Sequence, residues 1–571
     1  MKYSEDMEYR WTFLDTAGSD FEIGYQHGSA IPEPCQKGIA FFFCDLYKRA
    51  LNTQKTSFLR AFGVNLADQL IQKTLIKRLK KNIPAWAMER IRGLSEGSKL
   101  SLDDLCLAFV LPDVLPILEA YLRRVSPKSF ALPSLPNAIF GCSSFFYKRS
   151  DGLLFGRNLD FPGVGYWDRF PVLQKIAIPG SIPYVAFTTA GMPFGGISGV
   201  NEAKIAVCLH QHYSADVSAS GKLPYIISEQ VLRKAESLSD AQKIIQEESS
   251  ASAWAFLVAD GKKNQASIFE KSAHYLSQVP LTEKYLSHAN HFQGEVCRAD
   301  EFSMSEKMNW DNHFRRLCLS HKLSSFSEDI DIHQALVILS DHTDLFWNQE
   351  KIINRTVSQI FNIQSLLLDF SNFDVWLASG KSPIHLNSYQ RFDLQRVFSG
   401  QLENQDERRL SGFAFKDPSK HRAKIKLVES LQSAMSGDFS KACQQMKMCL
   451  SESFEPECAI IYATLLFKQR DFDEAINVLL RAEEAVENCV KNASEESKSY
   501  PPEYFEIGLN LARAYRLTGN VSQMNFHKNR IIKNAFLIDA LIVNLARKVD
   551  HYSLREVDVN LTAYSTYMPL R

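Results

Sequence analysis

The sequence predicts an α+β protein, with a layered domain of strands and helices followed by a domain made only of helices. Three observations carry this prediction. Short β-rich runs recur between residues 142 and 259, and helical periodicity returns among them at 224–237 and 239–247. From about Ser419 onward the pattern is helical throughout and repeats part of itself. Strands and helices in separate runs are typical of a layered α+β or αββα domain.

The first region, residues 1–141, precedes the β-rich part and reads as helical at 41–51 and 85–100. It ends in the segment SPKSFALPSLPNAIFG, which holds three prolines. Because proline blocks regular hydrogen bonding, we expect this segment to be an extended, accessible connector that leads into the first strand.

The second region, residues 142–400, is expected to form the layered domain. The predicted strands are 142–147, 153–158, 184–189, 205–209 and 254–259. Between the first two runs stands the pair Asp151-Gly152, a strong signal for a tight β-hairpin turn. A linker is expected over residues 401–420.

The third region, residues 421–571, is expected to be a helical-repeat domain. GDFSKA at 437–442 recurs as RDFDEA at 470–475, an offset of 33 residues. That offset is close to the period of about 34 residues of tetratricopeptide repeats. The alternative is an irregular helical bundle. A repeat domain of this kind predicts a protein partner.

The charge balance and the lack of long apolar runs give no support for a nucleic-acid partner or a membrane span. Lys plus Arg and Asp plus Glu number 65 each, so net charge gives no argument for a nucleic-acid partner. No run of about 18 apolar residues occurs, and the start MKYSEDMEYRW has no apolar segment. We therefore expect no transmembrane segment and a cytoplasmic location.

The sequence predicts no cofactor and no metal. The 11 cysteines are scattered without CxxC pairs, which argues against a disulfide framework and against a structural zinc site. The chain also lacks a GxxxxGK[ST] phosphate loop and an HExxH zinc motif. Most of the cysteines are expected to be buried small apolar side chains.

Cys142 has a different setting, because it follows Gly141 at the entrance of a predicted strand. A thiol there can attack the preceding carbonyl in an N-to-S acyl shift, and hydrolysis then frees the α-amine of Cys142. A free α-amine has a pKa of about 7.7–8.0 and acts as a base near neutral pH. One residue would supply both nucleophile and base. The alternative is an ordinary buried strand cysteine.

The next strand carries FGRNLDF at 155–161. Alternation places Arg157 and Leu159 on one face and Asn158 and Asp160 on the other. Arg157 is suited to hold a thiolate or a substrate carboxylate, and Asp160 to orient a charged α-amine. The alternative is an exposed pair of charges at a strand end.

Together, the cysteine, the hairpin turn and GRNLDF resemble the opening of the cysteine N-terminal-nucleophile (Ntn) hydrolases. That group includes the bile salt (choloylglycine) hydrolases, penicillin V acylase, acid ceramidase and the isopenicillin N acyltransferase family. GCSSF before GRNLDF, behind a long leading segment, looks most like the acyltransferase family, which makes its nucleophile by self-cleavage at Gly-Cys. The resemblance extends over about residues 15–380, with GSDFEIGYQHG at 18–28, IRGLSEG at 91–97, LSHANHF at 286–292 and a strand pair near 356–361 and 374–378.

The resemblance implies an αββα Ntn-hydrolase sandwich and assigns site residues. Gly141 and Cys142 match the cleavage site, and Cys142 matches the nucleophile. Asp160 matches the residue that binds the amine of the nucleophile, and Arg157 the basic residue beside the thiol. Asn290 matches the asparagine that supports the oxyanion, with a turn asparagine as the alternative.

Further candidates are less well determined. His210 and Gln211 stand where bile salt hydrolases have an asparagine, so the oxyanion site is expected to be built differently. His291 is either a support for the site or structural. Relatives carry another arginine near Arg315, but the sequence does not separate Arg315 from Arg316.

These observations predict a self-cleaving amidohydrolase or acyltransferase. It would act on the C–N or thioester bond of an N-acyl small molecule through a Cys142 thioester, without a cofactor. The alternative is a non-catalytic adaptor that uses the tetratricopeptide-like domain to bind protein.

Overall fold

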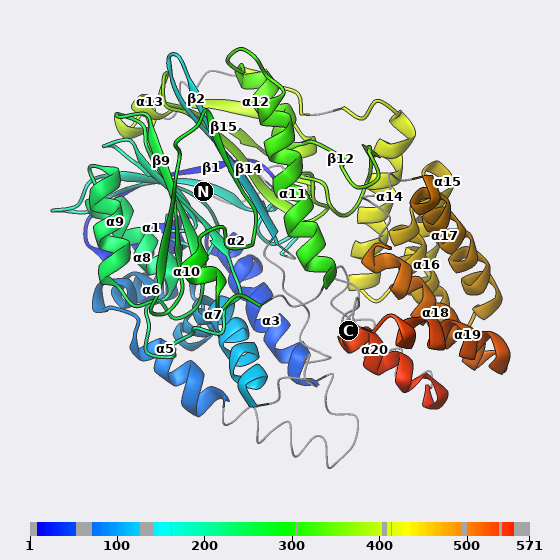
Figure 1. The fold of residues 1–571 in the computed structure, drawn as a ribbon. Coiled ribbons are helices and arrows are strands. Elements are labelled where there is room, and N and C mark those ends of the chain that lie inside the picture. Colours follow the sequence, from blue (N-terminus) through cyan, green and yellow to red (C-terminus); the bar gives the residue numbers. More distant parts are fainter. Residues whose placement is uncertain are drawn as a thin grey trace.

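The computed structural model describes residues 8–52, 71–125, 141–161, 163–302, 306–401, 408–412, 414–492, 500–535 and 540–552. The predicted α+β class is confirmed, since two large sheets and many helices make up the chain (Figure 1). The proline-rich connector before Gly141 lies outside the described residues. Within them, no helix has both the length and the apolar character needed to cross a bilayer.

The larger sheet joins the first and second regions of the chain. In spatial order its strands are β1 (Thr12–Ala17), β4 (Pro171–Ala177), β5 (Tyr184–Thr189), β6 (Ser198–Asn201), β7 (Ile205–Gln211), β8 (Trp254–Asp260), β9 (Gln265–Lys271) and β10 (Leu276–Pro280). Strand β1 pairs with β4 in parallel, and the following pairs are antiparallel. The first region of the chain therefore contributes a strand, β1, to this sheet.

The second sheet carries the hairpin with Cys142. Its order is β11 (Tyr285–His288), β2 (Gly141–Arg149), β3 (Gly152–Asp160), β14 (Asn362–Asp369), β15 (Asp374–Ala378), β16 (Tyr389–Asp393) and β17 (Arg409–Leu410). Neighbouring strands are antiparallel. Arg149 pairs with Gly152, so the tight turn consists of Ser150 and Asp151, one residue earlier than predicted.

The strand expected over residues 356–361 is wrong, because these residues form a loop and β14 starts at Asn362. Two residues just before, Asn354 and Arg355, have φ angles of 61° and 50°. This left-handed conformation is incompatible with a strand. A small antiparallel pair, β12 (Thr343–Asp344) with β13 (Gln349–Glu350), lies before this loop in the chain.

Side-chain alternation divides the core into layers. On β7, Ala206 and Cys208 belong to a cluster that also contains Phe146 and Phe155 of the second sheet. Leu209, like its strand neighbours at 205 and 207, belongs instead to a cluster shared with helices. Since successive strand residues face opposite sides, the two sheets pack face to face and each has a helix-covered outer side.

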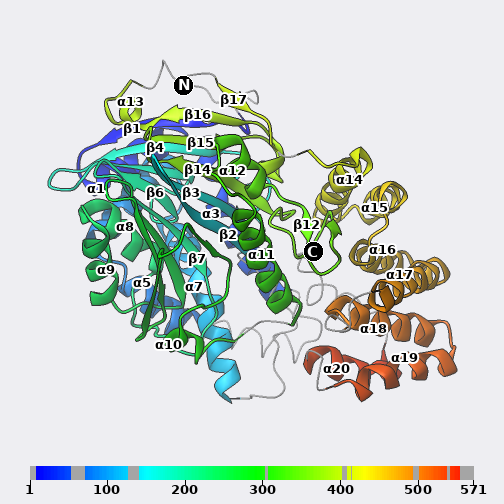
Figure 2. The ribbon, with the colours of Figure 1, turned by 45° about the horizontal axis from the view of Figure 1, so that its top comes forward.

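Helices cover both outer sides (Figures 1 and 2). The larger sheet shares its outer core with α1 (Asp20–Ala30), α2 (Pro32–Lys37), α3 (Ile39–Asn52), α5 (Lys77–Lys81), α6 (Ala85–Ser98), α7 (Leu102–Val125), α8 (Pro224–Lys234) and α9 (Leu238–Glu247). The second sheet packs on α11 (Glu306–Ser324) and α12 (Ile332–Leu339). The short α10 (Glu295–Arg298) lies between β11 and α11, and α13 (Leu394–Phe398) lies between β16 and β17.

Helices α1 and α6 approach each other closely through glycines. A Cβ on Gly24 would lie 1.9 Å from the carbonyl oxygen of Arg90, and one on Gly93 would lie 1.9 Å from that of Phe21. No side chain fits at such distances, so both positions require glycine. This contact gives a physical reason for the glycines at 18–28 and 91–97.

The C-terminal region consists of helices that pack in sequence order. They are α14 (Pro418–Met435), α15 (Phe439–Glu452), α16 (Pro456–Gln469), α17 (Phe472–Asn492), α18 (Pro502–Leu517), α19 (Val521–Lys533) and α20 (Ala540–Arg547). The two halves of the sequence echo occupy equivalent turns, where Gly437 and Arg470 have positive φ angles. Asp438 and Asp471 follow and accept hydrogen bonds from the first turns of α15 and α17. The echo is therefore a repeated helix-turn-helix connection.

Buried charges join the C-terminal helices to the sheet domain. Arg355, from the loop before β14, is 2% exposed. Its guanidinium bonds Asp344 in β12 at 3.0 Å and both carboxylate oxygens of Glu503 in α18 at 2.8 and 3.0 Å. Burial alone raises the pKa of Glu503, but the Arg355 charge lowers that pKa to about 2. Glu503 is thus ionised and paired with Arg355.

A second buried contact lies at α14. Lys424 Nζ donates to Ser358 Oγ at 2.7 Å, to the Ser358 carbonyl at 2.8 Å and to His342 Nε2 at 3.0 Å. Burial lowers the pKa of Lys424 to about 7. The helical region is therefore anchored in the interior of the sheet domain and is not a loosely attached appendage.

We expect Glu503→Gln to lower the free energy of unfolding by about 3 kcal/mol, because it leaves Arg355 buried with one carboxylate fewer. Urea unfolding of the full-length chain measures this. Glu452→Gln is the matched control, since Glu452 pairs with Arg422 at the surface and its loss should change little. Equal effects of the two substitutions would contradict the prediction that the buried Arg355–Glu503 pair contributes more to stability than the surface Arg422–Glu452 pair.

Candidate active site

The register of the β2–β3 hairpin sets which side chains surround Cys142. Cys142 pairs with Leu159, and Ser144 pairs with Arg157. These four residues share the face that looks toward the larger sheet, as the alternation in the sequence predicted. Asp160 lies on the opposite face, toward α11 and α12. The site therefore has an inner side with the thiol and an outer side with the carboxylate.

The backbone nitrogen of Cys142 is held by Asn290, just after β11. Cys142 N donates to Asn290 Oδ1 at 2.6 Å. The amide nitrogen of Asn290 donates to the Gln211 carbonyl at 2.9 Å, and its own carbonyl accepts from Asn312 Nδ2 at 2.9 Å. Asn290 is thus held by three hydrogen bonds, and its side-chain oxygen accepts from the nitrogen of Cys142.

Arg315 in α11 is the centre of the outer side and is fully buried. Its partners are the Cys142 carbonyl (2.6 Å), Ser143 Oγ (3.0 Å), Asn290 Oδ1 (3.1 Å), Asn312 Oδ1 (2.5 Å) and Asp311 Oδ2 (2.7 Å). A planar guanidinium with five N–H groups can satisfy so many acceptors at once, and a lysine cannot.

The structure separates Arg315 from Arg316. Arg316 Nε bonds His291 Nε2 at 3.1 Å, away from Cys142. Burial, together with the charges of Arg316 and Arg315, lowers the pKa of His291 to about 3. Sequence reasoning missed Asn312 and Asp311 as partners. Their spacing was a usable signal, because Asp311 stands one helical turn before Arg315.

Asp160 is buried and incompletely bonded. Asp160 Oδ1 accepts from Asn362 Nδ2 at 2.8 Å, but Oδ2 has no hydrogen-bond partner among the described residues. Burial raises the pKa of Asp160 to about 7, against the lowering effect of Arg315. A Cβ on Gly141 would lie 3.8 Å from Oδ2. The free oxygen therefore lies beside the residue that precedes Cys142.

On the inner side, the thiol lies near Arg157. Cys142 Sγ is 4.0 Å from Arg157 Nη2 and 4.0 Å from the Leu209 carbonyl. Arg157 is oriented by Ser198 Oγ, by Gln364 Oε1 at 3.1 Å and by the Leu209 carbonyl at 3.0 Å. Burial raises the pKa of the Cys142 thiol, and the Arg157 charge opposes this effect. A base is therefore needed to form the thiolate.

His210 lies next to the site as a neutral group. Its Nε2 is 2.7 Å from Ser144 Oγ. Burial lowers the pKa of His210 well below its ordinary value, and the charge of Arg157 lowers it further. Two more buried histidines follow, with the Nε2 atoms of His212 and His288 3.0 Å apart. His210 was a candidate from the sequence, whereas Ser144, His212 and His288 were not predicted as part of the site.

Gln211 lies near Asn290 and also forms a side-chain hydrogen bond with helix α7. Helix α7 contains Pro112 and Pro116. Because Pro116 has no N–H, the carbonyl of Pro112 loses its helical partner. Gln211 Nε2 donates to that carbonyl at 2.8 Å. The candidate residue thus ties β7 to α7.

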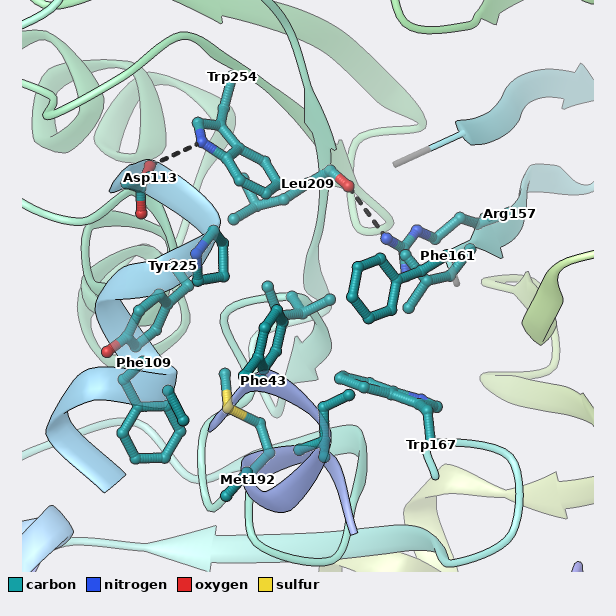
Figure 3. A pocket seen from close by; sticks show the side chains of 16 residues that line it. Phe43, Phe109, Asp113, Arg157, Phe161, Trp167, Met192, Leu209, Tyr225 and Trp254 are labelled. Atoms are coloured by element: carbon teal, nitrogen blue, oxygen red, sulfur yellow. Dashed lines mark hydrogen bonds between the residues drawn. The ribbon is translucent and has the colours of Figure 1, made fainter. Parts of the chain in front are cut away.

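A largely apolar pocket adjoins the thiol (Figure 3). Its lining residues are Ile39, Ala40, Phe43, Ala108, Phe109, Pro112, Asp113, Arg157, Leu159, Phe161, Trp167, Met192, Ile197, Leu209, Tyr225 and Trp254. The empty space among them, including the part open to solvent, is about 710 Å³. Arg157 and Leu209 lie in its wall, and both are near Sγ.

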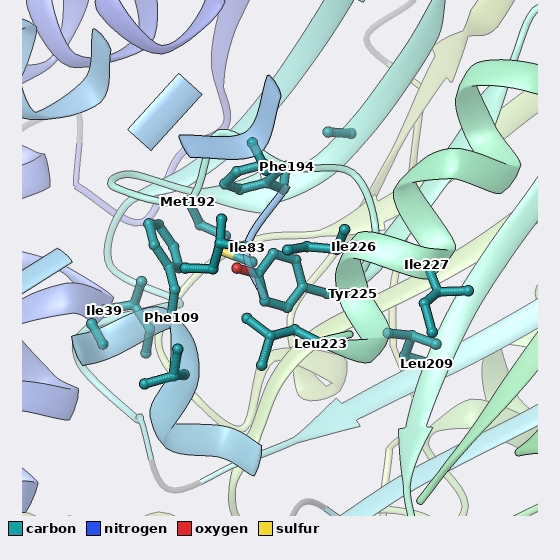
Figure 4. Close-up of a cluster of buried hydrophobic side chains, with 14 of the residues drawn as sticks. Ile39, Ile83, Phe109, Met192, Phe194, Leu209, Leu223, Tyr225, Ile226 and Ile227 are labelled. Carbon is teal, nitrogen blue, oxygen red and sulfur yellow. The ribbon is translucent and has the colours of Figure 1, made fainter. Parts of the chain in front are cut away.

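The pocket wall is continuous with a packed core that holds it in shape. Phe109, Phe194 and Tyr225 meet edge-on or tilted, with ring centroids 5.4–6.2 Å apart (Figure 4). Such aromatic contacts fix ring orientation beyond simple burial. The wall therefore combines helices from the first region with strands from the second.

Comparison with known proteins gives a consistent picture. Residues 147–382 match the family model of acyl-coenzyme A:6-aminopenicillanic acid acyl-transferase. One similar protein is the acyl-coenzyme A:6-aminopenicillanic-acid-acyltransferase 40 kDa form of Emericella nidulans. It is 24% identical over 321 residues, which cover 54% of this chain and 76% of that protein. The resemblance read from the sequence is therefore confirmed for this part of the chain.

The raised pKa of Asp160 predicts a pH effect on stability. The folded protein holds the Asp160 proton more tightly than the unfolded chain, so this contribution is complete below about pH 4 and is lost as pH rises to about 7. In a Cys142→Ala background, Asp160→Asn should remove up to roughly 4 kcal/mol of this dependence. Urea unfolding of both variants at several pH values measures the difference. Parallel pH curves would contradict the prediction.

Proposed function

From the relationship of residues 147–382 to the acyltransferase family, we propose that this chain is a cysteine Ntn enzyme of acyl transfer or amide hydrolysis. In this proposal the chain cuts its own Gly141–Cys142 bond, and Cys142 then carries the acyl group as a thioester.

One observation carries the proposal. Asp160 presents a buried oxygen without a hydrogen-bond partner, and this oxygen lies beside Gly141. Cleavage at Gly141–Cys142 would create an α-ammonium group there. A buried carboxylate is stable when paired with a cation, so the proposed product supplies the partner that the uncut chain lacks.

The maturation step is an N-to-S acyl shift. Cys142 Sγ attacks the Gly141 carbonyl carbon, the C–N bond breaks, and the thiol proton ends on the Cys142 nitrogen. Water then hydrolyses the Gly141 thioester, which releases a carboxylate and restores the thiol. Asn290 holds the Cys142 nitrogen and Arg315 holds the Cys142 carbonyl, so both groups flanking Cα are fixed during this step.

Turnover uses the freed α-amine as the base. The amine accepts the thiol proton, and Sγ attacks the substrate carbonyl carbon. The leaving amine or thiol departs with that proton and leaves an acyl-Cys142 thioester. Water or an amine acceptor then takes the acyl group. The buried thiol has a raised pKa, which fits a mechanism that supplies its own base.

We assign the remaining roles from these contacts. Arg157 stabilises the charge that develops on Sγ, and Asp160 binds the α-ammonium. Asn290 positions the nucleophile nitrogen, and we assign its amide group, which donates to the Gln211 carbonyl, as a donor for the oxyanion. His210 and Gln211 support the site from β7. His291 is structural in this proposal.

The pocket indicates the substrate class. Its walls are mostly aromatic and aliphatic, and they begin at Arg157 and Leu209 beside the thiol. We infer that an apolar acyl group occupies it, delivered by an amide or by an acyl thioester such as an acyl-coenzyme A. The domains in this proposal are a leading chain at 1–141, an αββα Ntn sandwich at 142–400, a linker at 401–420 and tetratricopeptide-like helices at 421–571.

The adaptor reading has less support. Arg355 and Lys424 bury charged contacts between the helical region and the sheet domain. Arg355 N also donates to Asp311, which in turn bonds Arg315. The helical region therefore braces the catalytic site in this proposal, and protein binding is an additional role.

We expect purified protein to consist of residues 1–141 and a chain that begins at Cys142, because Asp160 and Asn290 favour the cut product. Intact mass spectrometry measures this, with Cys142→Ala as the uncut control. Cys318→Ala, which changes another buried cysteine, should still cleave. One uncut chain in every sample would argue against the proposal.

Arg315→Lys should slow self-cleavage at least about a hundredfold, since one ammonium cannot replace contacts that each contribute 1.5–3 kcal/mol when charged. The conversion of freshly translated chain, followed by gel, gives the rate. Arg316→Lys is the matched control and should cleave at nearly the native rate. A similar loss in both variants would assign the effect to helix α11 as a whole.

A further inference from the structure

Asp113 is an unexpected residue in the wall of the apolar pocket. It belongs to α7, is 1% exposed and lines the pocket with aromatic and aliphatic neighbours. Figure 3 shows it on the opposite side of the cavity from Arg157. The pocket therefore has a basic group near the thiol and an acidic group at its far side.

Only one oxygen of Asp113 is used by the fold. Oδ1 accepts from Ser252 Oγ and from Trp254 Nε1, the latter at 3.0 Å. Oδ2 makes no hydrogen bond, and no basic side chain pairs with Asp113, among the residues that the structure describes. The fold thus orients the carboxyl group through Oδ1 and leaves Oδ2 without a protein partner.

A second polar atom in the same wall is also unsatisfied. The hydroxyl of Tyr225 is buried and has no hydrogen-bond partner within the described part of the chain. Buried polar groups in native structures are nearly always bonded to protein, water or ligand. The Tyr225 side chain and the free oxygen of Asp113, which lines the pocket, together give this wall polar groups that a ligand with a polar end could satisfy.

The chemistry of the wall favours a cation. Burial raises the pKa of Asp113 to about 7, so this environment disfavours the ionised form of its carboxyl group. A bound ammonium would reverse this preference by pairing with the carboxylate. The aromatic rings of Tyr225 and Trp254, which also line the pocket, add the faces that attract cations.

Resting on the function proposed above, we propose that the acyl group carried by Cys142 ends in a protonated amine that binds Asp113 Oδ2. In this arrangement the apolar walls hold the chain of the acyl group, and Arg157 marks the reacting end. A terminal carboxylate would repel the ionised form of Asp113, and a terminal methyl would leave Oδ2 unsatisfied.

The test uses full-length protein whose state of cleavage has been established by mass. Matched straight-chain acyl thioesters of N-acetylcysteamine, ending in a methyl, hydroxyl, ammonium or carboxylate group, are compared over a series of chain lengths. Intact mass gives the rate at which each probe acylates Cys142. We expect the ammonium probe to react at least about tenfold faster than the methyl probe at the best length, equivalent to about 1.4 kcal/mol.

Asp113→Asn should abolish this preference, because asparagine keeps the Oδ1 acceptor for Ser252 and Trp254 but carries no charge. Asp103→Asn, which changes an exposed acid of the same helix, should retain it. If Asp113→Asn does not fold, the test uses the unsubstituted protein instead. Alkylamines and alkanols are then compared for how strongly each protects Cys142 from acylation. Amines should protect more strongly than alkanols of equal length.

The outcomes are distinct. No acylation of Cys142 by any probe would overturn the proposed function itself. Acylation without an advantage for the ammonium probe, or an equal advantage in Asp113→Asn, would overturn only the assignment of Asp113. A preference for the hydroxyl probe over the ammonium probe would also overturn it, in favour of a neutral donor.

Discussion

The buried guanidinium of Arg315 is the interaction on which the candidate site depends. It joins the carbonyl of Cys142 to Asn290 and to its own helix α11. A cation with so little exposure is stable only when acceptors surround it, so the segments that provide them are held in one arrangement. The hairpin, the turn after β11 and helix α11 are thereby fixed relative to one another. The position of the thiol follows from this constraint.

The same constraint reaches the helical region through a chain of polar contacts. Asp311 accepts from Arg315 on one side and from the Arg355 backbone on the other. Arg355 then pairs with Glu503, 148 residues farther along the chain. Arg315, Arg355 and Glu503 are buried and Asp311 is half-buried, so their electrostatic interactions are screened less than in water. Cys142 and the C-terminal helices therefore belong to one packed unit.

Local pattern was enough to predict much of the fold and the inner part of the site. Strand alternation in GRNLDF placed Arg157 on one face and Asp160 on the other, and the register agrees. The helical echo at 437–442 and 470–475 became two equivalent turns. Contacts between residues far apart in the sequence could not be predicted from local pattern. Whether Arg315 or Arg316 faces Cys142 depends on the rotation of α11, which packing decides. The loop at 356–361 was mistaken for a strand because its apolar residues are buried as in a strand, although Ile360 and Phe361 pack on the core of the C-terminal helices.

The pocket is built from both sides of Gly141, and this has a consequence for how such a protein diverges. Phe43, Phe109 and Asp113 come from the first 125 residues, whereas Cys142, Arg157 and Asn290 come later. In the proposed enzyme, substitutions in α3 and α7 would therefore change which ligand the pocket accepts while Cys142 and its hydrogen-bond partners stay intact. Much of the part that would set specificity thus lies apart in sequence from Cys142, although Arg157 and Leu209 line the same pocket.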